Sequence, residues 1–185
     1  MTTPQKTARD VLHFWLRELE PEQHFRRDDA VDEMIRTRFG SLHDELSKGV
    51  PQTWLKTPQT ALAAVIVLDQ FSRNLFRGDG RAFATDEEAL RVARIAVGRG
   101  DLDRVSDREA YYFIMPYMHA EEVATIEECE ALFERRLPDG NGAKFARLHR
   151  DSVARFGRYP ARNEALGRES TPEELAFLKE NPSGF

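Results

Sequence analysis

The sequence has one cysteine among its 185 residues, Cys129, so an internal disulfide cannot form. This excludes a small scaffold built on disulfides and favours a reducing compartment. The first ten residues lack the basic segment followed by an apolar segment that marks a signal peptide. The longest uninterrupted apolar run, residues 61–68, is far shorter than a membrane-spanning helix. We therefore expect a cytoplasmic protein that does not enter a membrane.

The sequence also has no excess of positive charge: 27 basic residues face 32 acidic ones, so the formal net charge is −5 at pH 7. This balance argues against a general nucleic-acid-binding protein, because such proteins present a basic face. The basic residues are nevertheless concentrated, with six arginines and two acidic residues between positions 147 and 168. Arginine presents a planar fork that suits carboxylates, phosphates and buried ion pairs. This segment is therefore a candidate for anion binding.

Apolar residues recur with helical periodicity along the whole chain, and no stretch alternates as a β-strand does. Capping residues, prolines and glycines divide the chain into eight expected helices. They cover approximately residues 7–19, 28–49, 57–76, 85–98, 106–118, 125–137, 143–156 and 171–178. The helix at 57–76 is apolar on every side at its centre, so we expect other helices to cover it. The short connections predict antiparallel hairpins in a single all-α domain spanning residues 1–185.

Local signals refine some of these boundaries. Ser106 with Glu109, and Thr125 with Glu128, have the spacing of a capping box at a helix N-terminus. Pro116 should kink or shorten its helix, because the proline ring clashes with the preceding turn.

The first segment that could carry chemistry follows directly on the apolar run. Asp69 and Arg73 are four residues apart, which favours an ion pair on a helix, and Gln70 and Asn74 repeat this spacing. A charge so close to the apolar run needs a partner, because desolvation of an isolated charge is costly. The pair either fixes helix packing by itself or forms the polar wall of a site in which Arg73 and Arg77 bind an anion.

The second segment contains His119, which we expect on one helical face with Glu122. Such a pair could orient the imidazole for proton transfer or supply metal ligands. It could equally be a core histidine that a carboxylate satisfies. The sequence has neither a His-Glu-x-x-His motif nor a cysteine cluster, so we expect no metal. It also has neither a GxGxxG motif nor a P-loop, and we expect no cofactor.

The third segment runs from His149 to Arg168 and combines a helix end, a turn stiffened by Pro160 and several arginines. Loops with this many fixed donors often bind anions, but they also staple helix C-termini, where cations offset the helix dipole. Nucleophilic catalysis has no support in the sequence. It has no Gly-x-Ser-x-Gly motif, and Cys129 falls on the apolar stripe of a helix, where we expect inert core.

These three segments, in this order, resemble the bacterial family known as domain of unknown function 924. The family patterns are D-Q-F-x-R-N, P-x-x-H-x-E and R-F-G-R-[FY]-P-x-R-N, followed by L-G-R-x-S-T-x-E-E. The matching residues are Asp69, Gln70, Phe71, Arg73 and Asn74, then Pro116, His119 and Glu121, then residues 155–163, and finally Leu166, Gly167, Arg168, Ser170, Thr171, Glu173 and Glu174. The residue after the histidine, often serine in the family, is Ala120 here. The resemblance implies a tetratricopeptide-like all-α fold with a right-handed stack of hairpins, and it implies no established activity.

We expect the three segments to converge on one polar cleft that binds a small anionic molecule or the carboxylate end of a peptide. Arg73, Arg158 and Arg162 would bind the anion. The other ligand-binding residues would be Asp69, Gln70, Asn74, Arg77, His119, Glu121 and Asn163. The aromatic walls would be Trp15, Phe71 and Tyr159.

Two alternatives remain open from the sequence. The chain could be an enzyme with hydrolase-type acid/base chemistry, in which His119 or His149 acts as general base beside Glu121 and an arginine stabilises an oxyanion. The polar residues could instead be purely structural. Single alanine substitutions would then cost about 3–5 kcal/mol of stability, the scale of a broken buried ion pair.

Overall fold

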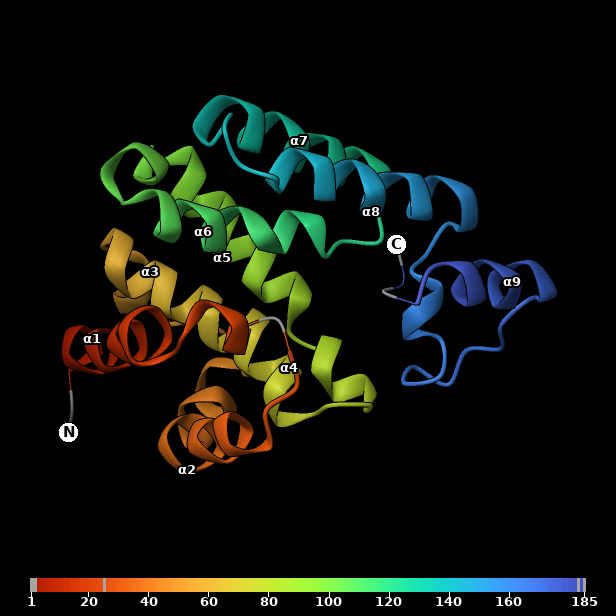
Figure 1. Ribbon diagram of the computed structural model, residues 1–185. Coiled ribbons are helices and arrows are strands. Elements are labelled where there is room, and N and C mark those ends of the chain that lie inside the picture. Colours follow the sequence, from red (N-terminus) through yellow and green to blue (C-terminus); the bar gives the residue numbers. More distant parts are fainter. Residues whose placement is uncertain (1–2, 25, 183, 185) are drawn as a thin grey trace. The chain divides into compact units, whose positions relative to one another are not determined.

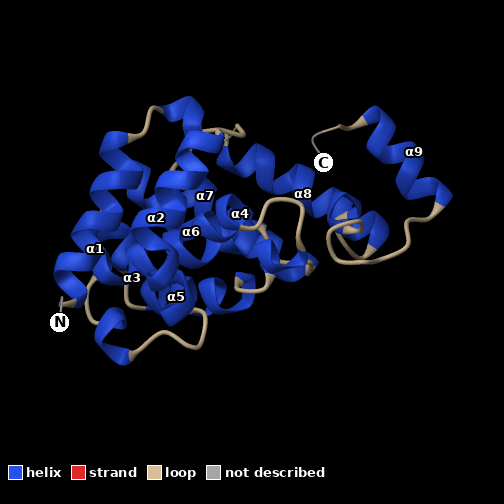
Figure 2. Cartoon of the chain, turned by 90° about the horizontal axis from the view of Figure 1, so that it is seen from below, coloured by secondary structure: helices blue, strands red, loops and turns tan. Residues whose placement is uncertain are grey.

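The computed structural model describes residues 3–24, 26–182 and 184 (Figure 1). Every regular element within these ranges is helical, which confirms the expected all-α class (Figure 2). The chain forms two compact units. Unit 1 comprises residues 1–77 and 81–116, and unit 2 comprises residues 78–80 and 117–185. The single domain and the tetratricopeptide-like stack stay predictions.

The first part of the chain, up to α6, is a series of α-helices connected by 3-10 turns and two π-helical segments. The α-helices are α1 (Pro4–His13), α2 (Asp29–Leu46), α3 (Pro58–Val65), α4 (Ser72–Leu75), α5 (Asp86–Gly98) and α6 (Asp107–Met118). The π-helical segments are η1 (Phe14–Glu18) and η4 (Ile66–Phe71). The 3-10 turns are η2 (Pro21–His24), η3 (Gln52–Leu55), η5 (Gly80–Phe83) and η6 (Asp101–Arg104).

The helix expected at 57–76 is confirmed as the centre of unit 1. Helix α3, η4 and α4 follow one another without a break, and residues 61–72 are all buried. Helix α3 contacts both α1 and α5, while α2 packs against η4 and α4 (Figure 1). Trp15 and Phe71, the expected walls of a cleft, are fully buried core rings in a T-shaped contact with centroids 5.4 Å apart.

Unit 2 is built on a pair of helices, α7 (Val123–Arg136) and α8 (Gly142–Phe156), followed by η7 (Pro160–Arg162) and α9 (Pro172–Glu180). Helices α7 and α8 pack together as a hairpin. Gly142 permits their close approach, since a Cβ atom there would lie 2.3 Å from the Phe133 ring. Cys129 is fully buried in α7, and burial raises the pKa of its thiol. The expected core position of this cysteine is thereby confirmed.

Some helix boundaries differ from expectation. The first helix begins at Pro4 rather than near Thr7, because Thr3 serves as the N-cap and its Oγ1 accepts a hydrogen bond from the Lys6 N–H at 3.4 Å. The prediction of a capping box formed by Thr125 and Glu128 at the N-terminus of this helix is wrong. Helix α7 begins at Val123, and the Thr125 hydroxyl lies inside the helix.

Other local signals are confirmed. Ser106 and Glu109 exchange capping hydrogen bonds, with the Ser106 N–H 2.9 Å from Glu109 Oε2. Pro116 lies inside α6, which ends two residues later at Met118. At the end of α8, Gly157 has a left-handed φ of 69°, the conformation of a glycine C-terminal cap. No helix in the described part of the chain is long and apolar enough to cross a bilayer.

Candidate functional site

Asp69 lies in the middle of η4 and is fully buried. Its carboxylate accepts a hydrogen bond from Gln70 Nε2 at 2.5 Å and pairs with Arg73, whose Nη1 lies 3.1 Å from Oδ1. The expected Asp69–Arg73 pair therefore forms, although the helix is π-helical here. These partners offset the desolvation of a carboxylate that has no access to water.

Arg73 binds a second carboxylate, that of Asp86 at the start of α5. Nη1 and Nη2 donate to the two Asp86 oxygens at 2.9 and 3.0 Å, and Nη1 also donates to the Asp69 carbonyl oxygen at 2.7 Å. Burial alone would lower the pKa of Arg73, but the charges of Asp69 and Asp86 outweigh it and raise the pKa. The guanidinium fork thus ties η4 to α5.

Asn74 and Arg77 both bind Asp32, a buried residue of α2. Asn74 Nδ2 donates to Oδ1 at 2.7 Å, while Arg77 Nε and Nη2 donate to the two carboxylate oxygens at 2.5 and 2.9 Å. Within unit 1, the predicted segment therefore forms two ion-pair networks. Both of its arginine forks are occupied by carboxylates that the sequence analysis did not single out, which favours the structural interpretation of this segment.

His119 is not on a helical face with Glu122, and that expectation is wrong. Helix α6 ends at Met118, residues 119–121 form a turn, and Glu122 is the N-cap residue of α7. The Glu122 carboxylate accepts a hydrogen bond from the Thr125 hydroxyl at 2.6 Å. The physical reason is the proline at the end of α6, after which the helix does not continue to His119.

Glu121 is bound to the arginine-rich loop of unit 2. Its two carboxylate oxygens accept hydrogen bonds from Arg168 Nη1 and Nη2 at 2.6 and 2.9 Å, and Oε1 also accepts one from the Tyr159 N–H at 2.8 Å. Burial would raise the pKa of Glu121, but these donors and the charge of Arg162 lower it. Glu121 therefore stays ionised and fastens the turn before α7 to the loop after α8.

Arg158 and Asn163 meet at Glu174 in α9. Arg158 Nε and Nη2 donate to the two Glu174 oxygens at 2.7 and 2.9 Å, and Asn163 Nδ2 donates to Oε2 at 3.2 Å. The Arg158 hydrogen bond is the main cause that lowers the pKa of Glu174 to about 2. Glu174 also forms a capping box with Thr171 at the start of α9. The fork of Arg158 is thus occupied within unit 2.

The ring of Tyr159 joins the remaining predicted residues of unit 2. The guanidinium of Arg162 lies over this ring, 4.6 Å from its centroid, and Nη2 donates to the His119 carbonyl oxygen at 3.0 Å. The His149 ring makes a T-shaped contact with the Tyr159 ring at 5.5 Å, and its Nδ1 lies 2.8 Å from the Phe145 carbonyl oxygen. Burial, and then the charges of His119 and Arg162, lower the pKa of His149 to about 4.

A serine–histidine pair that the sequence analysis missed lies in unit 1. His43 Nε2 is 2.7 Å from Ser72 Oγ, but the Ser72 hydroxyl is fully buried and donates to the Leu68 carbonyl oxygen at 2.7 Å. A catalytic serine must reach its substrate, so this pair is structural. His43 and Ser72 are 29 positions apart in the sequence, so their spacing gave no signal that they would meet.

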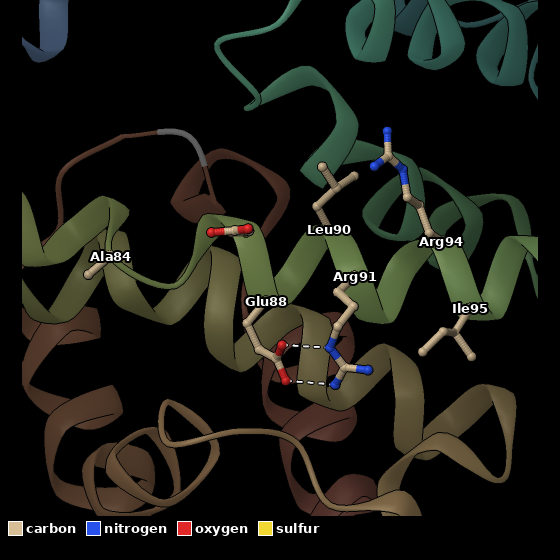
Figure 3. A pocket seen from close by; sticks show the side chains of 7 residues that line it. Ala84, Glu88, Leu90, Arg91, Arg94 and Ile95 are labelled. Carbon is tan, nitrogen blue, oxygen red and sulfur yellow. Dashed lines mark hydrogen bonds and ion pairs between the residues drawn. The ribbon is translucent and has the colours of Figure 1, made fainter.

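An open groove of about 630 Å³ runs along α5 (Figure 3). It is lined by Ala84, Glu87, Glu88, Leu90, Arg91, Arg94 and Ile95, none of which was predicted as a site residue. Figure 3 shows Leu90 and Arg94 on one side of the helix and Glu88, Arg91 and Ile95 on the other. Two hydrogen bonds of 2.7 Å join Arg91 to Glu88. The groove is therefore a solvated helix face with an internal ion pair.

The described residues contain no group of three or more histidine, cysteine or acidic side chains that could hold a metal ion. The structure brings together Asp69, Gln70 and Arg73, then Asn74 and Arg77, within unit 1. Within unit 2 it brings together His119, His149 and Arg162, and separately Arg158 and Asn163. Convergence of all these residues on one cleft stays a prediction.

The fold and these networks define an all-α protein whose arginine-rich segments bind internal carboxylates. The chain belongs to the family described as bacterial proteins of unknown function, DUF924, whose sequence profile matches residues 11–182. It is similar to the solved protein of unknown function ATU0120 from Agrobacterium tumefaciens. The two share 36% sequence identity with a TM-score of 0.89, over 95% of this chain and 98% of the other. No curated protein matches the chain.

Proposed function

We propose that the chain binds a small anion at the surface of unit 2 formed by His119, His149 and Arg162. The observation that supports this proposal is a group of three basic side chains: Arg162 and His149 both contact the Tyr159 ring, and His119 lies close enough to His149 to affect its charge. Their effect on one another is unfavourable, because the charges of His119 and Arg162 oppose the protonation of His149. A perturbed basic group of this kind is typical of binding sites.

The charge balance around these residues also favours an anion. The positive charges of Arg162 and Arg168 both lower the pKa of Glu121. Arg168 already donates hydrogen bonds to both oxygens of this carboxylate. One carboxylate opposite two guanidinium groups leaves a positive balance among these three side chains. A bound anion would improve this balance and would supply the negative charge that favours the protonated form of His149.

The proposed site contains fewer of the ligand-binding residues than the sequence predicted. Arg73 and Arg158 each bind a carboxylate of their own unit through two guanidinium nitrogens, so they support the fold in this proposal and do not bind the ligand. Arg162 is the predicted arginine that remains in the site. The ligand class is unchanged, a small anionic molecule or the carboxylate of a peptide end.

The test is an NMR titration of the histidine resonances with and without inorganic phosphate. In its absence we expect His149 to titrate with a pKa of about 4. Phosphate should raise that pKa by at least about one unit, which corresponds to about 1.4 kcal/mol of preference for the protonated form. Arg162→Gln should remove the phosphate effect, whereas Arg155→Gln, which removes an exposed arginine paired with Glu173, should not. An identical His149 titration with and without phosphate would refute the proposal.

The enzymatic alternative has one specific observation in its favour. The lowered pKa leaves the His149 imidazole unprotonated at pH 7, the form that a general base requires. In an enzyme, replacing His149 or His119 by alanine would abolish turnover of the bound molecule. In a binding protein the same substitutions would only weaken affinity.

A further inference from the structure

The groove along α5 contains a strip of residues with helical spacing. Four residues that line the groove are separated by four, three and four positions, namely Ala84, Glu88, Arg91 and Ile95. Helical positions at these spacings lie on one side of the helix. Figure 3 shows Glu88, Arg91 and Ile95 on the same side of α5, and Ala84 lines the groove just before the helix begins. We call these four residues the α5 stripe.

The α5 stripe is open to solvent. The Arg91 side chain is 43% exposed, Ile95 is 37% exposed, and Ala84 is exposed as well. Glu88 is half-buried, because its Oε1 accepts a hydrogen bond from the Val50 N–H at 2.8 Å. No described part of the chain covers the stripe. It is thus an accessible strip with two opposite charges in its middle and an apolar side chain at one end.

The two charges stand on either side of the midpoint of the stripe. In a second copy of the chain, related by a two-fold axis through that midpoint, α5 would run antiparallel to the first. Each Glu88 would then lie opposite Arg91 of the other copy, and each Ile95 would lie near Ala84 of the other copy. The stripe is therefore complementary to itself, in charge at its centre and in side-chain size at its ends.

We propose that the α5 stripe is the contact surface of a homodimer, in which the α5 helices of two copies pack antiparallel about a two-fold axis. Within one copy, Glu88 and Arg91 already pair through two hydrogen bonds of 2.7 Å. In the dimer each carboxylate gains the guanidinium of the other copy as a second positive neighbour. The four charges then form one alternating network, which contributes more than an isolated surface ion pair.

The order of the charges selects this arrangement over others. Parallel helices would place Glu88 opposite Glu88 and Arg91 opposite Arg91, and like charges opposite each other are unfavourable. An antiparallel arrangement with the axis at Arg91 would bring the two Arg91 side chains together. A different partner would need a matching order of charges at the same spacing, whereas a second copy has that order by symmetry.

The size of the contact predicts a weak dimer. Helix α5 has 13 residues and is therefore about 20 Å long. A pair of such helices buries less surface than the roughly 1,600 Å² of a standard interface. Salt should weaken the contact further, because its central groups are charged and close to solvent. We expect a dissociation constant of about 100 µM at low ionic strength.

The dimer surface is independent of the anion site proposed in unit 2. All four residues of the stripe belong to unit 1, and none of them is a residue of the unit 2 site. Either proposal can therefore fail without the other.

The test is sedimentation equilibrium of the full chain at low salt, from about 10 µM to about 1 mM, a range that brackets the expected dissociation constant. The apparent mass should rise from 21.3 kDa toward twice that value and no further. Glu88→Arg places two positive charges opposite each other, and Arg91→Glu places two negative charges opposite each other. Each substitution should weaken self-association by at least about tenfold.

Mixing the two variants provides the decisive measurement. An equimolar mixture of Glu88→Arg and Arg91→Glu should associate at least as well as the unaltered chain, because every pair across the two-fold axis then has opposite charges. A mixture that associates no better than either variant alone would overturn the proposal. A chain that stays monomeric up to about 1 mM would overturn it too, and so would association that continues beyond a dimer.

The exposed Glu33–Arg36 pair of α2 is the matched control, since it has the same spacing and order of charges. Its flanking positions hold Asp29 and Gly40, so it lacks an apolar contact, and Glu33→Arg should leave association unchanged. Equal weakening by Glu33→Arg would mean that only net charge matters and would overturn the proposal.

A further mixture covers the case in which Glu88→Arg does not fold, since this substitution removes the acceptor of the Val50 N–H. The Arg91→Glu chain mixed with the unaltered chain keeps one of the two favourable pairs across the axis. Its association should therefore lie between those of the two homodimers, and any other order would contradict the two-fold contact.

Discussion

The carboxylate of Asp69 is surrounded by side chains of its own segment. Gln70 and Arg73 both donate to it, and Asp86 shares the same guanidinium. Removing Asp69 would leave the amide of Gln70 without its acceptor and leave Arg73 with one carboxylate instead of two. An arginine that loses a buried partner destabilises the fold because its charge stays desolvated.

We therefore expect Asp69→Ala to lower the free energy of unfolding by about 3 kcal/mol, the lower end of the range for a broken buried ion pair, since Asp86 still offsets part of the charge. Urea unfolding followed by circular dichroism measures this loss. Glu33→Ala is the control. It breaks the exposed Glu33–Arg36 pair of α2 and should change stability by less than about 0.5 kcal/mol. Equal stability of the two variants would contradict the structural role of Asp69.

Single residues also show which contacts of the candidate site could be predicted from the sequence and which could not. The four-residue spacing of Asp69 and Arg73 predicted their ion pair, since neighbours on one helix are fixed by local geometry. Asp32 was not predicted as the partner of Arg77. The two are 45 residues apart, and which acid meets which arginine over such a separation depends on tertiary packing.

Among the helical elements, η1 and η4 are unusual because π-helical turns bond to the fifth following residue. Side chains take up carbonyl groups near them. The Leu68 carbonyl oxygen accepts hydrogen bonds from the hydroxyls of Ser72 and Thr85 at 2.7 and 2.6 Å, and the Trp15 carbonyl oxygen lies 2.6 Å from His24 Nε2. These contacts satisfy backbone groups that would otherwise be buried without partners.

The π-helical turns could not be predicted from the periodicity of apolar residues. Every residue from 61 to 68 is apolar. A change from α-helix to π-helix would alter the spacing of polar residues along one face, and this segment has no polar residues in which such a change could be seen. The existence and the burial of this helix were predictable for the same reason. Its continuous apolar character places it at the centre of unit 1 whatever its local pitch.

Thr85→Val tests the support of η4. Valine keeps the shape of threonine but has no hydroxyl, so the Leu68 carbonyl loses one donor and Ser72 loses a neighbour that lies 2.7 Å away. We expect a loss of about 1–3 kcal/mol in the free energy of unfolding, the cost of an unsatisfied buried polar group. Thr37→Val, on the exposed face of α2, should change it by less than about 0.5 kcal/mol. A Thr85→Val protein as stable as its control would show that η4 needs no such support.

On the scale of the whole molecule, α6 is the element that both units share, since unit 1 ends at Pro116 inside it. Unfolding of either unit would disturb this helix. We therefore expect the single domain predicted from the sequence to appear as one cooperative unfolding transition.

This expectation can be measured with two probes. Both tryptophans, Trp15 and Trp54, belong to unit 1, so their fluorescence reports on that unit, whereas far-ultraviolet circular dichroism reports on all helices. The two urea transitions should have the same midpoint. A second step seen by circular dichroism alone would mean that unit 2 unfolds separately.

The buried position of Cys129 has a practical consequence for such experiments. Because its thiol is enclosed and its pKa is raised, it should resist maleimide reagents while the protein is folded. A cysteine introduced on an exposed helix face would then be the single reactive position. A fluorophore or spin label could be attached there without first removing the native thiol.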